Sequence, residues 1–168
     1  KKTKNKRFTF KKFLKYFLLS LLLFLIGFTV YFFQAIKMPP PEISDTAIVN
    51  DSVRHIEGSL YGIKNNRIRK SESGLWELYV EGAAFERGVY NGKLATEPIL
   101  KQEDAFVEEI RNMIPSEGFL NFLKYMTAWF NRNMDDYVPE EYLQEIYGIS
   151  LSASSEFEFI GTNYERIL

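Results

Sequence analysis

The hydrophobic positions of this chain form one uninterrupted run, followed by shorter periodic segments. The run, residues 16–36, holds 14 Leu, Ile, Phe or Val among its 21 positions and no charged residue. At about 1.5 Å of rise per residue, a helix of this length covers about 31 Å, which matches the hydrocarbon thickness of a bilayer. The pattern therefore predicts a transmembrane helix.

The pattern becomes shorter and more polar after the run. Residues 37–73 contain three consecutive prolines, Pro39–Pro41, which favour an extended spacer, and continue as an irregular connecting segment with short strands. Apolar and polar side chains then alternate over residues 75–80, before Gly82. That alternation predicts a β-strand.

Apolar residues at spacings of three and four predict two helices after this strand. The first extends over residues 85–114, with a kink or a new start at Pro98. The second extends over residues 117–130, with Ser116 as its N-cap. Its apolar stripe suits either a buried face, such as the lid of an acyl pocket, or a surface in the bilayer interface.

A further helix is expected to begin with Pro139 in its first turn and to end at Gly148. Residues 74–168 thus combine one clear strand with several helices, which predicts the α+β class. The whole chain contains 15 Phe and 10 Tyr. So many aromatic residues beside a small core suggest apolar surfaces that another chain covers, as in a fragment of a larger fold.

Charge differs sharply between the two ends of the chain. The head, residues 1–15, has eight Lys or Arg and no acidic residue, whereas residues 37–168 have 13 Lys or Arg against 22 Asp or Glu. This bias predicts a cytoplasmic N-terminus and an extracytoplasmic domain, on the periplasmic side of a bacterial inner membrane. A cleavable signal peptide is the alternative, but its apolar region is shorter and ends at small residues. We therefore expect an uncleaved signal anchor.

Composition argues against several functional classes. An acidic domain is a poor partner for nucleic acid. The chain has no cysteine, so it supplies no disulfide, thiol nucleophile or thiolate metal site. His55 is the only histidine, so neither a triad nor a metal site is expected, and no cofactor is predicted. Asp135 and Asp136 are interpreted as a solvated turn.

Two segments resemble motifs of a known family. Residues 78–92 read LYVEGAAFERGVYNG, and residues 138–150 read VPEEYLQEIYGIS. The first resembles the strand, Gly-x-x-x-Glu-Arg-Gly and Tyr-x-x-Gly pattern that opens the C45 peptidase-like family. This family includes the acyl-coenzyme A:6-aminopenicillanic acid acyltransferases and choloylglycine-hydrolase-like proteins. The second resembles a later helix of that family, and we expect structural roles for the matching residues Gly82, Glu86, Arg87, Gly88, Gly92 and Gly148.

The resemblance implies an N-terminal-nucleophile (Ntn) hydrolase, an αββα sandwich formed when one precursor cleaves itself. Residues 74–168 would be its α portion, and a β chain from the same precursor would complete the fold. The nucleophile of the family is the N-terminal cysteine of that β chain. This chain ends without a cysteine, as a released α chain would, so we expect no catalytic residue in it.

The implied chemistry follows from an N-terminal cysteine, whose own α-amine, with a pKa of about 7.7–8, accepts the thiol proton. The resemblance implies an extracytoplasmic acyltransferase or amidase that acts on an amide- or thioester-linked substrate. A membrane tether and an aromatic interior suggest a lipid-like acyl group. The alternative is a non-catalytic, membrane-anchored subunit or scaffold of a cell-envelope complex.

Other residues of the matching region have open alternatives. Glu86 and Arg87 would form a buried ion pair, a solvated pair or a helix-dipole interaction. Gly82, Gly88 and Gly92 do not have phosphate-loop spacing, and close packing of a helix on a sheet explains them better. Three residues near the end of the chain are candidates for lining the pocket, with structural roles as the alternative: Asn163, Tyr164 and Arg166.

Overall fold

The structure is a computed structural model that describes residues 10–168. It divides into two compact units, residues 1–37 and residues 38–168, which we describe separately. The first unit contains helix α1 (Phe10–Ala35), in which no residue is buried. This helix is long and apolar enough to cross a membrane, which confirms the predicted span-length helix. Residues 1–9 of the predicted basic head lie outside the described residues.

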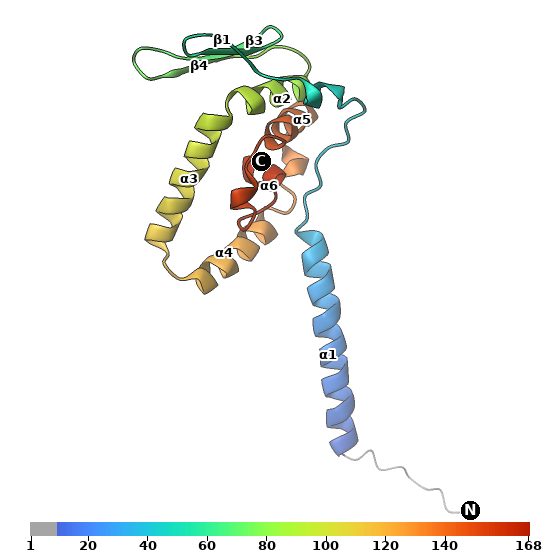
Figure 1. The fold of residues 1–168 in the computed structure, drawn as a ribbon. Coiled ribbons are helices and arrows are strands. Elements are labelled where there is room, and N and C mark those ends of the chain that lie inside the picture. The colour runs from blue at the N-terminus through green and yellow to red at the C-terminus, as the bar shows by residue number, and fades with distance from the viewer. Residues whose placement is uncertain (1–9) are drawn as a thin grey trace, which may run out of the picture. The chain divides into compact units, whose positions relative to one another are not determined.

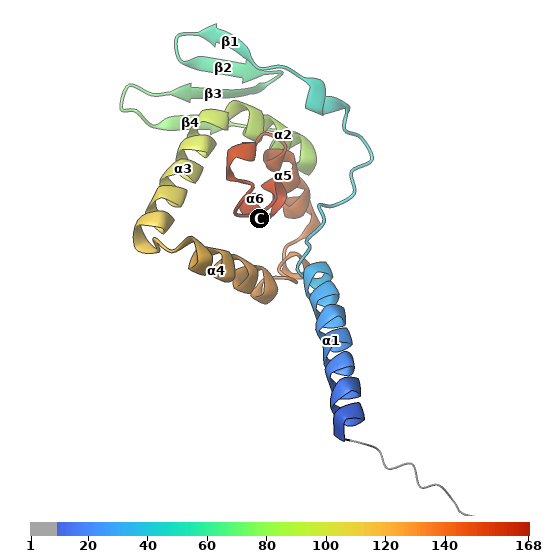
Figure 2. The same ribbon diagram turned by 60° about the horizontal axis from the view of Figure 1, so that its bottom comes forward.

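The second unit contains a four-stranded antiparallel sheet in which each strand pairs with the next along the chain (Figure 2). Its strands are β1 (Arg54–Glu57), β2 (Leu60–Ile63), β3 (Asn66–Lys70) and β4 (Trp76–Tyr79). The strand predicted over residues 75–80 and the short strands before it are confirmed. Because β3 pairs with β4, the sheet extends across the expected boundary at residue 74.

Five helices follow the sheet: α2 (Ala84–Leu94), α3 (Thr96–Met113), α4 (Glu117–Phe130), α5 (Glu140–Ser150) and α6 (Asn163–Ile167). The predicted helix over residues 85–114 is two helices that meet at Ala95, and Pro98 lies in the first turn of α3, where its missing N–H is harmless. Ser116 is the N-cap of α4, as predicted, and accepts a hydrogen bond from the Phe119 N–H.

The core of the second unit lies between the sheet and α2. Its buried residues are Ile63, Ile68, Tyr90, Leu94 and Ala95. On the other side α2 packs against α5, while α3 leads away from the sheet and α4 returns toward α5 (Figures 1 and 2). Three short 3₁₀ turns complete the unit: η1 (Ala47–Asn50), η2 (Asp135–Tyr137) and η3 (Ser155–Phe157). This arrangement confirms the α+β class.

Candidate functional site

The two segments that carry the family resemblance meet where α2 contacts α5, and glycines form the contact. A Cβ atom on Gly88 would overlap the carbonyl group of Glu145. One on Gly148 would lie 2.6 Å from both Phe85 O and Val89 N, and one on Gly92 would lie 2.7 Å from Ile149 O. The two backbones therefore approach as closely as only glycine permits.

Two sequence interpretations of these glycines are wrong. Gly88 and Gly92 serve the packing of a helix on a helix, not of a helix on the sheet. Gly148 does not end its helix, because α5 continues to Ser150. A glycine near a helix end resembles a stop signal, but here the missing side chain makes room for α2.

The remaining motif residues fix the start of α2 against α5. Gly82 has φ = +121°, which suits glycine, and its carbonyl accepts a hydrogen bond of 3.0 Å from Arg87 Nη1. Arg87 also donates through Nε (3.2 Å) and Nη2 (2.8 Å) to Glu145 Oε2 on α5. Arg87 therefore pairs with Glu145 and not with Glu86. Half-buried at 31% and 24% side-chain exposure, this pair links the two motif segments.

Glu86 instead joins a polar cluster that holds the segment before the sheet onto α2. We call this the α2 polar cluster; it comprises Asp51, Lys64, Glu86, Tyr90 and Lys93. The buried Tyr90 hydroxyl lies 2.9 Å from Glu86 Oε1 and 3.2 Å from Asp51 Oδ2. Lys93 Nζ donates to the carbonyl oxygens of Val49 and Asp51. The cluster thus connects η1, the β2–β3 hairpin and α2.

Lys64 enters this cluster from a strained position. It lies in the two-residue loop between β2 and β3 with φ = 52°, a conformation that glycine adopts more easily. Its Nζ lies 2.9 Å from Asp51 Oδ2 and 5.4 Å from the centre of the Tyr90 ring. The Tyr90 oxygen and, secondly, Asp51 raise the pKa of Lys64 above its usual value. These contacts offset the backbone strain.

Acidification is expected to loosen the attachment of residues 47–53 to α2, which the carbonyl contacts of Lys93 then hold alone. The hydrogen bond from the Lys64 ammonium is the main reason why the pKa of Asp51 is below its ordinary value of 3.8, and the Tyr90 hydroxyl lowers this pKa further. A lowered pKa in the folded state means that these contacts stabilise at neutral pH and are lost as the pH falls below 3.8. Hydrogen–deuterium exchange, corrected for intrinsic rates, should show faster exchange of residues 47–53 at acid pH, while β3 stays protected. In the Asp51→Asn variant, the exchange rate of residues 47–53 should not rise as the pH is lowered.

The three candidate pocket residues near the end of the chain pack inside the fold. Asn163 Nδ2 donates to Ala153 O, and the buried Tyr164 ring lies edge-on to Tyr147. Arg166 donates to Glu103 Oε1 on α3 through Nε (2.9 Å), and its other nitrogens donate to the carbonyl oxygens of Ser154 and Gly161. With side-chain exposures of 6% and 14%, Arg166 and Glu103 form the most buried ion pair among residues 10–168.

Tyr164→Phe is expected to leave stability unchanged or slightly higher. Within residues 10–168 the buried Tyr164 hydroxyl has no hydrogen-bond partner, and removing such a group avoids a desolvation penalty of about 1–3 kcal/mol. Tyr164→Ala should instead cost about 3–5 kcal/mol, because it leaves a cavity beside Tyr147. Urea unfolding followed by circular dichroism distinguishes the two. A large loss in Tyr164→Phe would mean that the hydroxyl has a partner.

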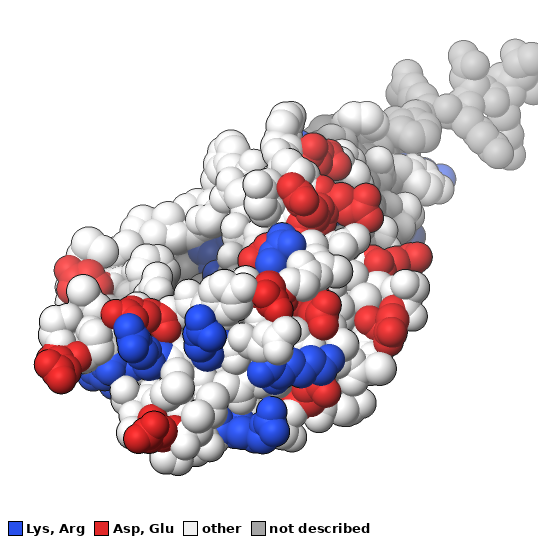
Figure 3. All heavy atoms as spheres, turned by 90° about the horizontal axis from the view of Figure 1, so that it is seen from above, with Lys and Arg blue, Asp and Glu red and all other residues white. Residues whose placement is uncertain are grey.

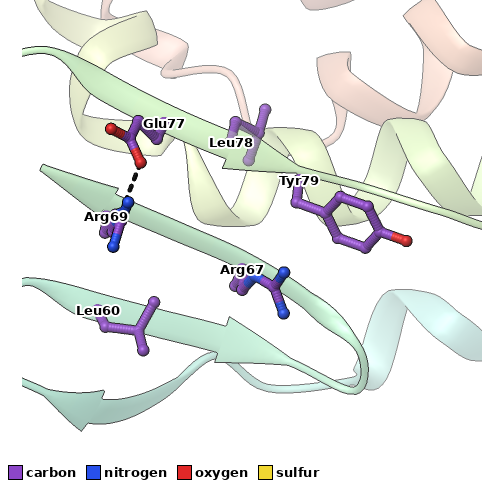
Figure 4. A pocket seen from close by; sticks show the side chains of 6 residues that line it. All are labelled: Leu60, Arg67, Arg69, Glu77, Leu78 and Tyr79. Atoms are coloured by element: carbon purple, nitrogen blue, oxygen red, sulfur yellow. Dashed lines mark hydrogen bonds and ion pairs between the residues drawn. The ribbon is translucent and has the colours of Figure 1, made fainter. Parts of the chain in front are cut away.

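An open groove crosses the outer face of the sheet, with a volume of about 480 Å³ (Figure 4). Leu60, Arg67, Arg69, Glu77, Leu78 and Tyr79 line it. Arg69 is paired with Glu77 at 2.6 Å, and the Arg67 guanidinium lies 5.0 Å from the centre of the Tyr79 ring. Basic and acidic side chains also interleave on the face seen in Figure 3. The groove therefore offers no concentrated charge for an anionic ligand.

Among residues 10–168, no group of three or more His, Asp or Glu is placed to hold a metal ion. His55 lies exposed on β1, where its Nε2 is 2.9 Å from Gly58 O in the same hairpin. Asp136 is exposed and Asp135 half-buried in η2, which agrees with a turn. The site is a structural junction of two motif segments.

Sequence reasoning missed the partners of the motif residues. Glu145 is the partner of Arg87 that the sequence interpretation missed. Its position in the second motif, three residues before Gly148, could have indicated that it contacts the first motif. Glu103, the partner of Arg166, lies at helical spacing with Ile99, Val107 and Ile110. A carboxylate on an apolar stripe indicates a buried charge that needs a partner. Asp51 and Lys64 had no comparable signal.

Comparisons with protein-family models, with curated protein sequences and with solved structures find no match for this chain.

Proposed function

We propose that this chain is the membrane-anchored α portion of an extracytoplasmic Ntn-type cysteine acyltransferase or amidase. Its substrate would carry an amide- or thioester-linked, lipid-like acyl group. One observation carries the proposal: the two segments that resemble the family motifs form a single junction, held by glycine contacts and by the Arg87–Glu145 pair. This contact, which joins residues 58 positions apart in the sequence, is what supports the resemblance.

The proposal assigns chemistry to a companion β chain and support to this chain. The reactive thiol and its base, the α-amine, would both belong to an N-terminal cysteine of the companion. This chain has no cysteine and would hold one wall of the acyl pocket. The α2–α5 junction gives that wall a rigid base, as a positioned catalytic group requires.

The sheet provides a place for the companion to join. Strands β1 and β4 lie at the two edges of the four-stranded order, so within residues 10–168 each leaves one side of its backbone unpaired. Unpaired N–H and C=O groups of an edge strand pair readily with an added strand. Growth at either edge would enlarge this sheet toward the sandwich that the resemblance implies.

The proposed topology places residues 1–15 in the cytoplasm and residues 38–168 on the periplasmic side of a bacterial inner membrane. The span-length helix α1 and the eight basic residues before the apolar run support this orientation. An extracytoplasmic domain without cysteine is also insensitive to an oxidising compartment.

Labelling with 2-cyanobenzothiazole tests the companion directly, because this reagent condenses with the 1,2-aminothiol of an N-terminal cysteine. This chain would be purified through an affinity tag from detergent-solubilised membranes of cells that carry its complete gene. We expect a second, labelled polypeptide that co-purifies with it. Changing the cysteine of the precursor to Ala should abolish both the label and the cleavage, so that one unlabelled precursor remains. This chain itself must stay unlabelled, since it has no cysteine. Purification with no labelled companion would overturn the proposal and favour the non-catalytic scaffold.

A further inference from the structure

Helix α4 carries an apolar surface that the second unit covers only in part, because three of its phenylalanines are exposed and its other large apolar side chains are half-buried. We call this surface the aromatic face; it comprises Phe119, Phe122, Leu123, Met126, Trp129 and Phe130. At about 100° per residue these six positions occupy about a third of the helix circumference. None of the 14 residues of α4 is buried, and Phe119, Phe122 and Phe130 are 50%, 55% and 73% exposed. A helix so apolar is normally covered on this face.

The helix is attached to the rest of the unit by another side. Lys124 lies about 140° around the helix from Phe119. Its Nζ donates a 2.7 Å hydrogen bond to Phe159 O, in the loop before α6. The aromatic face therefore lies on another side of the helix than this attachment. In Figure 2, α4 lies at the periphery of the unit.

The region around α4 is basic although the unit as a whole is acidic, and one of its cations, Arg132, lies beside the aromatic face. Residues 111–132 contain three cations and one anion, whereas residues 38–168 contain 12 Lys or Arg against 22 Asp or Glu. The Arg111 guanidinium lies 5.0 Å from the centre of the Phe159 ring, whose residue also receives the Lys124 hydrogen bond. The Arg132 guanidinium lies 4.4 Å from the centre of the Trp129 ring. Arg132, at the edge of the aromatic face, therefore has the position of a cation that complements lipid phosphates above acyl chains, whereas Arg111 and Lys124 belong to the attachment side.

The chain also keeps this unit close to a bilayer. Only residues 36–46 separate the end of α1 from η1, and 11 residues reach at most about 40 Å when fully extended. A surface that interacts weakly with lipid is therefore present at high effective concentration.

We propose that the aromatic face of α4 is a membrane-docking surface. Its Phe, Met and Trp side chains enter the headgroup and upper acyl region of a phospholipid bilayer, and Arg132, which contacts Trp129, lies at the level of the phosphates. Docking fixes the orientation of residues 38–168 toward the bilayer. This inference does not depend on the companion chain or on its nucleophile.

The two tryptophans of the chain allow a direct test in the full-length protein. Trp129 lies on the aromatic face, whereas Trp76 packs against the core between the sheet and α2. The full chain would be reconstituted into phosphatidylcholine vesicles whose acyl chains are brominated in both leaflets, which makes the result independent of insertion direction. In the Trp76→Phe variant, all tryptophan fluorescence comes from Trp129, and in the Trp129→Phe variant, it all comes from Trp76.

We expect brominated lipid to quench Trp129 at least about twofold more strongly than Trp76, as insertion by about 5–10 Å requires. Aqueous iodide should quench Trp129 weakly. In the Trp76→Phe background, replacing Phe119, Phe122 and Phe130 by Ser should reverse both effects. The matched control Leu75→Ser, at a position that is 69% exposed beside β4, should change neither. Circular dichroism checks that each variant is folded.

Two results would overturn the inference. In the first, brominated lipid quenches Trp129 no more than Trp76, and iodide quenches Trp129 strongly. The aromatic face would then lie in water. Trp129 shielded from both quenchers would show that protein covers it, either the fold itself, in which it is half-buried, or a partner or a second copy of the chain.

Discussion

Gly88→Ala is expected to lower the free energy of unfolding of the second unit by about 3 kcal/mol, the upper end of the usual cost of overpacking. The added methyl group would overlap the backbone carbonyl of Glu145, and a backbone carbonyl in α5 cannot move aside as a flexible side chain can. The two helices would separate, which also stretches the hydrogen bonds of 2.8 and 3.2 Å between Arg87 and Glu145. Urea unfolding of the full chain in detergent, followed by circular dichroism, measures the loss.

Gly118→Ala is the matched control, because Gly118 is also helical but a Cβ there would have no atom within 4 Å. At such a position alanine usually stabilises a helix by about 0.5–1 kcal/mol. Opposite signs for the same substitution at the two sites would establish the α2–α5 contact. Equal urea midpoints of unfolding for Gly88→Ala and Gly118→Ala would show that α2 and α5 do not approach as closely as described.

The sequence predicted well the features that depend on local order. The helix of membrane-spanning length, predicted over residues 16–36 and found over Phe10–Ala35, follows from length and apolarity alone. Ser116 is recognised as an N-cap because its hydroxyl lies next to N–H groups from which it can accept a hydrogen bond. The strand over 75–80 shows the period of two that a half-buried strand requires. Each of these signals lies within a few residues of the feature it predicts.

The contacts of the candidate site could be predicted only in part. The pattern showed that Gly88 and Arg87 matter, but their partners lie on α5, and nothing local indicates which helix packs against which. Gly148 was misread because a glycine near a helix end has two physical uses, and sequence alone does not separate them. The α2 polar cluster joins segments 39 residues apart through Tyr90 and Asp51.

Arg166→Met is expected to destabilise the second unit by about 3–5 kcal/mol, the usual cost of removing one partner of a buried ion pair. The change leaves the Glu103 carboxylate on α3 without its cation, and that side chain is only 14% exposed. It also removes the hydrogen bonds to the carbonyl oxygens of Ser154 and Gly161, which hold the loop between α5 and α6. Unfolding in urea should therefore occur at a markedly lower concentration.

Two further variants distinguish the effect of losing an ion pair from the effect of leaving a charge buried. Arg69→Met breaks the exposed Arg69–Glu77 pair, whose side chains are 60% and 49% exposed, and should cost less than about 1 kcal/mol. The double variant Glu103→Leu with Arg166→Met replaces the buried pair by apolar groups and should recover most of the loss, because no unpaired charge remains. If the double variant were as unstable as Arg166→Met, the loss would come from the carbonyl contacts of Arg166. α6 would then depend on its own loop for its position and not on α3.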